Sequence, residues 1–200
     1  MNKLEYEKIK DYSYLDYCDY LQKKYGVGKY PYFTTGWSRN KSAARTSEGL
    51  VIHHKFEDHA IMLGEPKFAI MNPYEWQLPE NLIYCDYLEH LLLHIMICEH
   101  PAPDHNDREA VGIGGVINFI VPELNDLYSG WVTKQAWRAE CHKRVIDDKD
   151  VYLELLKRFK HNCNKYPLYT DRCLYTSFNA AFGLWDAKKN FPLFDEIKKL

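Results

Sequence analysis

The sequence predicts an α+β fold that is mainly helical and folded as a single domain. Its 200 residues suffice for one unit with a sizeable core. Aromatic residues make up 15% of the chain, which is typical of a globular protein and excludes a disordered one. Two short apolar runs predict strands, and helical periodicity dominates most of the remaining chain.

Residues 1–44 are expected to form an N-terminal helix and an extension. A tyrosine-rich amphipathic pattern predicts the helix over residues 3–24, ended by Gly26 and Gly28. Residues 29–45 are predicted to be irregular. They mix aromatic with basic side chains, which could either bind nucleic acid by stacking and phosphate neutralisation or anchor the segment on the core. The aromatic members are Tyr30, Tyr32, Phe33 and Trp37, and the basic ones are Lys29, Arg39, Lys41 and Arg45.

Residues 45–100 carry a strand–strand–helix pattern. Strands are predicted over residues 49–55 and 82–85, joined by a long connection over residues 56–80. Asp86 is expected to cap the helix that follows, with Glu89 completing a capping box. This helix should run to about Cys98, before Pro101.

Residues 101–200 are predicted to be a helical region packed in the same unit. Helices are expected over residues 108–121, 133–145 and 150–162, with a closing helical segment over 178–200. The first of these includes a glycine cluster at 112–115. No Lys-Ser or Lys-Thr follows the cluster, so a phosphate-binding loop is disfavoured.

Charge and cysteine usage limit the classes of function. The formal net charge is −2, so any nucleic-acid contact must come from local basic patches and a bound cation. Six cysteines lie scattered without a C-x-x-C pair, which argues against a cysteine zinc ribbon. No signal peptide or membrane-spanning run is recognisable, so we expect a cytoplasmic protein with reduced thiols and no membrane contact.

Four histidines form the most informative constellation. His53 and His54 are neighbours in the first predicted strand, so their side chains should point to opposite faces. His90 and His94 lie four residues apart and share one helix face. One strand histidine can therefore join the helical pair on a metal ion while the other faces substrate. Three imidazoles with open positions are typical of a catalytic metal set.

The pattern also contains Asn81 at the start of the second strand, nine residues before His90. With these residues, the segment from about 45 to 98 resembles the HNH (ββα-metal, His-Me finger) nuclease family. It is most similar to the three-histidine variant found in colicin-type DNases and many phage HNH endonucleases. The resemblance covers less than half of the chain and departs from the family's pattern between His54 and Asn81.

The resemblance implies a role for each of these residues. His53, His90 and His94 would hold one divalent cation, Mg²⁺ or Zn²⁺ in the first place and Mn²⁺ or Ni²⁺ otherwise. His54 would be the general base that activates water, and Asn81 would tie the motif together and help to orient that base. Arg45 would hold the scissile phosphate.

The implied activity is endonucleolytic hydrolysis of DNA, and it should fall as the pH drops below the ordinary histidine pKa of about 6.5. Two alternatives stay open: a nuclease acting on RNA, and a non-catalytic nucleic-acid-binding protein with a structural metal. An enzyme that cuts both strands would form a homodimer.

Other polar residues near the constellation allow more than one interpretation. Glu57 and Asp58 either orient a ligand imidazole or start a loop. His100 is either a support for the site or solvated, and His59 is expected at the surface. His105, His142 and His161 have no assignable partner in the sequence.

Overall fold

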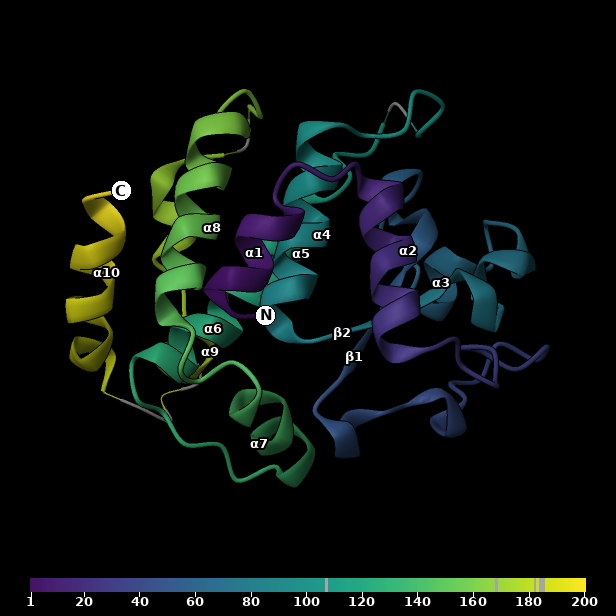
Figure 1. Cartoon of the computed structure of the whole chain (residues 1–200), viewed down its shortest axis with the longest axis horizontal. Coiled ribbons are helices and arrows are strands. Elements are labelled where there is room, and N and C mark those ends of the chain that lie inside the picture. The colour runs from purple at the N-terminus through teal and green to yellow at the C-terminus, as the bar shows by residue number, and fades with distance from the viewer. Residues whose placement is uncertain (107, 168, 182, 184–185) are drawn as a thin grey trace.

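The described part of the chain folds into helices and one two-stranded hairpin, which lies beside α2 and α4 (Figure 1). The computed structural model describes residues 1–200 except 107, 168, 182, 184 and 185. The expectation of a mainly helical α+β structure is confirmed. The helices and strands are α1 (Lys3–Ile9), α2 (Tyr14–Tyr25), β1 (Val51–His54), α3 (Pro66–Ala69), β2 (Leu82–Cys85), α4 (Tyr87–Glu99), α5 (Ile113–Gly115), α6 (Val121–Tyr128), α7 (Ala136–Lys143), α8 (Lys149–Asn162), α9 (Phe178–Ala181) and α10 (Phe191–Lys198).

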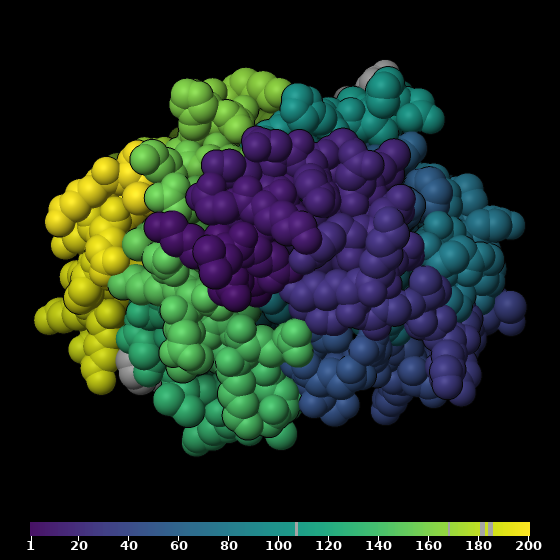
Figure 2. Space-filling view, viewed as in Figure 1, coloured from purple at the N-terminus to yellow at the C-terminus, as the bar shows by residue number. Residues whose placement is uncertain are grey.

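The N-terminal segment contains two helices, so the prediction of one helix over 3–24 is wrong. Ser13 has an extended backbone, and its hydroxyl accepts a hydrogen bond from the Asp16 amide, which starts α2 afresh. Asn2 caps α1 in the same way. Together α1 and α2 form the purple surface at the front of the molecule in Figure 2.

The hairpin places the two neighbouring histidines on opposite faces. β1 and β2 pair antiparallel, with His53 opposite Ile83 and His54 opposite Leu82. The predicted second strand has the observed bounds, and the first is shorter by two residues at its start and one at its end. Because side chains alternate along a strand, His53 points towards α2 and α4, while His54 points towards the connection between the strands.

The connection between the strands is ordered by short turns. It contains 3₁₀ turns at Lys55–Asp58, Tyr74–Gln77 and Pro79–Asn81, with α3 between the first and second of these. Phe56 stacks on Trp76 with ring centroids 4.8 Å apart, which fastens the first turn to the second.

Helix α4 is the central element and carries His90 and His94. The predicted capping box is confirmed, because Asp86 accepts from the Glu89 amide and the Glu89 carboxylate accepts from the Asp86 amide. The helix ends at Glu99, one residue beyond the predicted end. Most of its side chains are buried, and α2, α5, α8 and the hairpin pack around it.

The helix predicted over residues 108–121 begins later and runs further. Gly112 has a φ of +82°, which ends the preceding loop, and α5 begins at Ile113. A π-helical turn at Val116–Ile120 joins α5 to α6. The glycines let this segment approach α4 closely: a Cβ at Gly112 would lie 2.8 Å from the His94 carbonyl oxygen.

The C-terminal part is helical as predicted, with shifted bounds. Helix α7 occupies the middle of the predicted 133–145 segment, and α8 begins one residue earlier than predicted. The closing segment is divided into α9 and α10, with residues 182, 184 and 185 outside the described part. The hydrophobic core draws buried side chains from helices along most of the chain, including Ile9 of α1, Leu91 of α4 and Ile197 of α10. Among the described residues, every helix is too short or too polar to cross a bilayer.

Candidate metal centre

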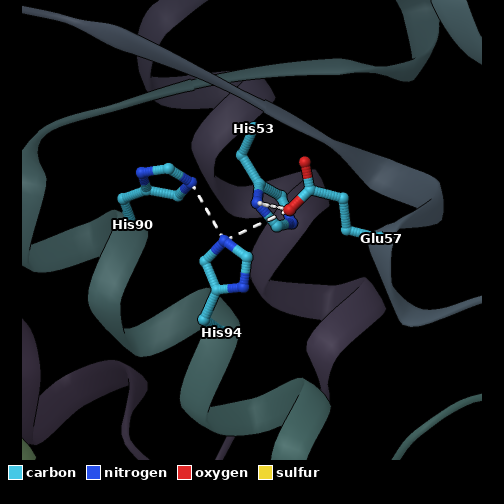
Figure 3. A group of neighbouring side chains, drawn as sticks. All are labelled: His53, Glu57, His90 and His94. Carbon is cyan, nitrogen blue, oxygen red and sulfur yellow. Dashed lines mark hydrogen bonds and ion pairs between the residues drawn. The ribbon is translucent and has the colours of Figure 1, made fainter. Parts of the chain in front are cut away.

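Three histidines and one glutamate converge beside α4 (Figure 3). His90 and His94 project from consecutive turns of α4, His53 comes from the end of β1, and Glu57 comes from the turn that follows β1. One donor atom from each lies within 4.8 Å of all the others. The structure therefore brings together the three histidines predicted as ligands, and the cluster could hold a metal ion.

The spacing of these donors fits a single ion. A tetrahedral ion with bonds of 2.0–2.1 Å keeps its ligand atoms about 3.3 Å apart. Here His94 Nε2 lies 3.2 Å from His90 Nε2 and 3.2 Å from Glu57 Oε2. The same Glu57 oxygen lies 3.5 Å from His53 Nδ1. Three edges of the cluster thus already have the length that coordination requires.

Tyr14 fixes the tautomer of His53. The Tyr14 hydroxyl donates to the Lys55 carbonyl oxygen at 2.8 Å, so it can only accept from His53 Nε2, also at 2.8 Å. The proton of His53 is therefore on Nε2, and Nδ1 carries a lone pair. His53 Nδ1 is buried without a hydrogen-bond partner and faces Glu57. This is the arrangement of a metal-ligating histidine whose second nitrogen is held by a neighbour.

Two of the imidazoles, those of His53 and His90, are held in their neutral form. Burial lowers the pKa of His53 well below its ordinary value of 6.5: it outweighs the Glu57 carboxylate, which raises this pKa, and the nearby His94 and His90 lower it further. Burial and His94 lower the pKa of His90 to about 3. Since only a neutral imidazole can bind a metal ion, these two side chains are ready to coordinate at neutral pH.

Glu57 is the donor that the sequence did not assign to the ligand set. Burial alone would raise the pKa of its carboxyl group, but the surrounding His53, His54 and His94 hold it well below the ordinary value. The carboxylate is therefore anionic. Its second oxygen, Oε1, lies 3.5 Å from His54 Nδ1. Of the two sequence interpretations, a contact with the imidazoles is the one that the structure shows for Glu57.

Gln77 holds His54 on the opposite face of the strand. The Gln77 amide nitrogen donates to the Leu63 carbonyl oxygen at 3.4 Å, which directs its oxygen at His54 Nε2, 3.1 Å away. His54 Nε2 therefore carries the proton, and Nδ1 faces Glu57 with a lone pair. The ring of Tyr32 covers His54 with a centroid separation of 4.4 Å.

Gly115 packs directly against the His94 imidazole. A Cβ built on this glycine would lie 2.3 Å from His94 Cε1 and 2.4 Å from Nδ1, far inside van der Waals contact. The glycine cluster was the available signal in the sequence, since conformationally permissive residues allow a close approach. The sequence did not indicate which side chain would be approached.

Two predicted site residues have other partners. Arg45 binds both carboxylate oxygens of Glu48, at 2.7 and 2.6 Å, donates to the Tyr25 carbonyl oxygen at 2.5 Å, and lies over the Tyr84 ring. The structure therefore does not bring Arg45 to the cluster. The Asn81 side chain donates to the Glu75 carbonyl oxygen at 2.8 Å. It orders the connection, while the hydrogen bond expected from it to His54 is made by Gln77.

The remaining histidines lie outside the cluster. His59 lies outside the cluster with its side chain 25% exposed, and its Nδ1 lies 2.6 Å from Asp58, which is not a member of the cluster either. His142 Nε2 contacts Glu123 at 2.5 Å, and His105 Nδ1 lies 2.6 Å from the Ala102 carbonyl oxygen. His100 and His161 line a groove of about 970 Å³ beside α8.

That groove has mixed charge. It lies between the α1–α2 junction, the end of α4 and α8, and Tyr14 also lines it. Arg158 binds both carboxylate oxygens of Glu99 there, at 2.8 and 2.6 Å. The two charges neutralise each other, so the groove is not a uniformly basic surface.

Part of the aromatic and basic extension packs against the protein, while Lys29, Tyr30 and Lys41 are exposed. Phe33 is buried, and Arg39 stacks on Tyr32 with its guanidinium carbon 3.4 Å from the ring centroid. Tyr32 in turn covers His54. Of the two interpretations of residues 29–45, the structure shows an aromatic anchor for these side chains, and that anchor is part of the wall of the site.

No protein-family model, curated protein or solved structure matches this chain. The chemistry of the cluster follows from its own residues. That site is recessed: the exposed fraction is 0% for His53, 1% for His54 and 6% for His94, and the Glu57 side chain is 17% exposed. Glu57 is thus one of the more open sides of the cluster.

Proposed function

We propose that the chain is a metal-dependent nuclease that hydrolyses phosphodiester bonds of DNA with a water activated by His54. The observation that carries this proposal is the pairing of two differently held histidines on one strand. His53 offers a lone pair to the cluster from one face, and His54 offers a lone pair beside the same cluster from the other. A metal set and a neighbouring general base are the two parts that such hydrolysis requires.

His53, His90 and His94 would hold the ion, with Glu57 as a fourth donor. A bound divalent cation supplies stabilisation of the negative charge on the phosphate and on the leaving oxygen. Three imidazole nitrogens favour Zn²⁺ or another transition-metal ion over Mg²⁺, which prefers oxygen ligands and retains water. The tautomer set by Tyr14 presents the lone pair of His53 without any rearrangement.

His54 is suited to accept the proton of the attacking water at Nδ1. Gln77 holds the proton on Nε2 and fixes the ring plane, so Nδ1 is the only basic atom of this side chain. The resulting imidazolium would keep its hydrogen bond to the Gln77 oxygen.

Cleavage of supercoiled plasmid tests this function. The protein is incubated with Mg²⁺, Mn²⁺, Ni²⁺ or Zn²⁺ in turn, beside the His54→Ala variant and beside a labelled RNA. We expect cleavage with at least one transition-metal ion and a loss of 10²–10⁴-fold in rate for His54→Ala, the usual contribution of a general base. Cleavage of RNA but not plasmid would move the substrate to RNA. Absence of cleavage with every ion would refute the enzymatic proposal.

A structural metal site in a nucleic-acid-binding protein is the second candidate. It is favoured by the four donors, which are enough to close a tetrahedral site. Such a site would stabilise the fold strongly, and a chelator would lower the melting temperature without any cleavage activity to be lost. Measuring both quantities on one preparation separates the two candidates.

A further inference from the structure

We propose that Glu57 is a displaceable ligand of the metal centre, which a phosphate-type oxyanion replaces when it binds. This inference rests on the proposed metal site. The proposal adds an anion-binding position to that site. The anion and the Glu57 carboxylate would occupy the same position in turn.

The first step is that Glu57 needs a cation in front of it. The tautomers set by Tyr14 and Gln77 leave lone pairs on His53 Nδ1 and His54 Nδ1, and both atoms face the Glu57 carboxylate at 3.5 Å. An acceptor facing an anionic acceptor at this distance is repulsive unless a cation, either the proton of an imidazolium or a metal ion, lies between them. A metal ion shared by Glu57 Oε2, His53 and His94 would remove this repulsion at His53 Nδ1.

The second step is that little else holds the carboxylate. Among the residues that the structure describes, imidazoles are its sole hydrogen-bonding or ionic partners. In the part of the chain that the structure describes, neither a backbone amide nor a lysine or arginine contacts it. A carboxylate anchored in this way can leave the ion by giving up its contacts with these imidazoles alone.

The third step is the position of the two carboxylate oxygens. One oxygen faces the metal ligands His53 and His94, and the other faces His54 (Figure 3 shows the first of these contacts). A phosphate group bound for attack by a His54-activated water must present one oxygen to the ion and lie beside His54. Glu57 therefore occupies the place that a phosphate oxyanion needs.

The fourth step concerns access. The Glu57 side chain is 17% exposed, whereas His53 is fully buried, and Glu57 belongs to a short 3₁₀ turn whose Phe56 departs from helical geometry. A rotation of the Glu57 side chain towards solvent would open the cluster without moving β1 or α4. The turn thus places a removable anion at an open side of the centre.

Binding of Zn²⁺ and of inorganic phosphate tests this inference. Zinc affinity is measured by competition with a chelator, and phosphate affinity by titration calorimetry of the zinc-loaded protein. The variants are Glu57→Ala and the isosteric Glu57→Gln, with Asp58→Asn as matched control. Asp58 is the next residue of the same turn and pairs with His59, away from the cluster.

We expect both Glu57 variants to bind Zn²⁺ at least tenfold more weakly and, when zinc-saturated, to bind phosphate at least tenfold more tightly. Asp58→Asn should change neither affinity by more than about twofold. Unchanged zinc affinity in both Glu57 variants would show that Glu57 is not a ligand. Weaker zinc binding with unchanged phosphate affinity would show that the Glu57 carboxylate and phosphate do not occupy the same position. Either result overturns the inference.

The measurement also separates this inference from the proposed function. If zinc and phosphate behave as expected but no variant cleaves DNA or RNA, the nuclease proposal fails and the anion-exchange site stands. If DNA is cleaved but the phosphate affinity is the same in the parent and in the Glu57 variants, the anion-exchange inference fails and the nuclease proposal stands.

Discussion

Replacing Gly115 with alanine should remove His94 from the metal centre without disturbing the helix that carries the new methyl group. Gly115 has φ −60° and ψ −44°, which alanine adopts readily. The added Cβ would lie 2.3 Å from His94 Cε1 and 2.7 Å from Nε2. Carbon atoms in contact are about 3.5–4.0 Å apart, so the imidazole must shift by about 1 Å or rotate away.

A displacement of this size is large for a metal ligand, because ligand distances are held to within about 0.2 Å. His94 Nε2 also forms two of the three close edges of the cluster, to His90 and to Glu57. Supporting contacts of metal ligands typically contribute 10–100-fold in affinity. We therefore expect Gly115→Ala to weaken Zn²⁺ binding by at least this factor, which corresponds to about 1.4–2.7 kcal/mol.

Gly114→Ala is the matched control. A Cβ at Gly114 would meet only the Asn118 amide nitrogen, at 3.8 Å, and neither glycine has a positive φ. Gly114→Ala should therefore keep the zinc affinity and gain up to about 1 kcal/mol of stability from the better helix former. Zinc affinity is measured by chelator competition, and folding by circular dichroism and urea unfolding of the metal-free proteins.

A double-mutant cycle makes the assignment to His94 specific. In a His94→Ala background the clash no longer exists, so Gly115→Ala should cost nothing further in zinc affinity. Gly115→Ala binding Zn²⁺ within twofold of the parent would refute the reasoning. An additional loss in the His94→Ala background would show that the methyl group acts through another part of the site.

Three further predictions follow from the groups that hold the histidines. Tyr14→Phe removes the acceptor for His53 Nε2–H and should weaken Zn²⁺ binding 10–100-fold. An unchanged affinity would show that Tyr14 does not set the tautomer of His53. Gln77→Leu should slow cleavage at saturating metal at least about tenfold while the zinc affinity stays the same, since it releases only His54; a parallel loss of zinc affinity would count against this division of roles. The metal-free protein should lose stability as the pH falls below 6.5. The pKa values of His53 and His90 are lowered in the folded protein, so in this pH range these side chains bind protons only in the unfolded chain. With a folded pKa of about 3, His90 alone should lower the free energy of unfolding by about 1.4 kcal/mol between pH 7.5 and 5.5. Urea unfolding of the parent and of His90→Ala at both pH values measures this contribution. An equal pH dependence of the two proteins would contradict the lowered pKa.

The parts of this site that could be predicted from sequence are those fixed by local periodicity. Alternation along a strand separated His53 from His54, and four-residue spacing on a helix united His90 with His94. The capping box at Asp86 depends on two residues three positions apart, so it too could be predicted from the sequence. Each of these features is decided within one secondary-structure element.

The parts that could not be predicted depend on contacts between elements. Tyr14 and Gln77 are 39 and 23 residues away from the histidines they hold, and nothing in their local pattern marks them. The break between α1 and α2 had a local signal, because Ser13 is followed three residues later by Asp16. The amphipathic pattern continues through Ser13, so it predicted one helix where the chain forms two. Periodicity alone therefore does not locate helix ends.

Arg45 and Glu57 together change the electrostatic character expected of the centre. Arg45 lies near His53 in sequence, but Glu48 and the Tyr25 carbonyl oxygen take its donors, so it adds no positive charge beside the ligands. Glu57 instead adds a negative charge in contact with them. With neutral imidazoles, a divalent ion and Glu57 leave a net charge of about +1, and a phosphodiester arriving beside a bound Glu57 would reduce that to zero while placing two anions in contact. If Glu57 leaves as the phosphate binds, the centre keeps a positive charge where negative charge develops during hydrolysis, so this chain can do without an arginine at the cluster only if Glu57 is able to move.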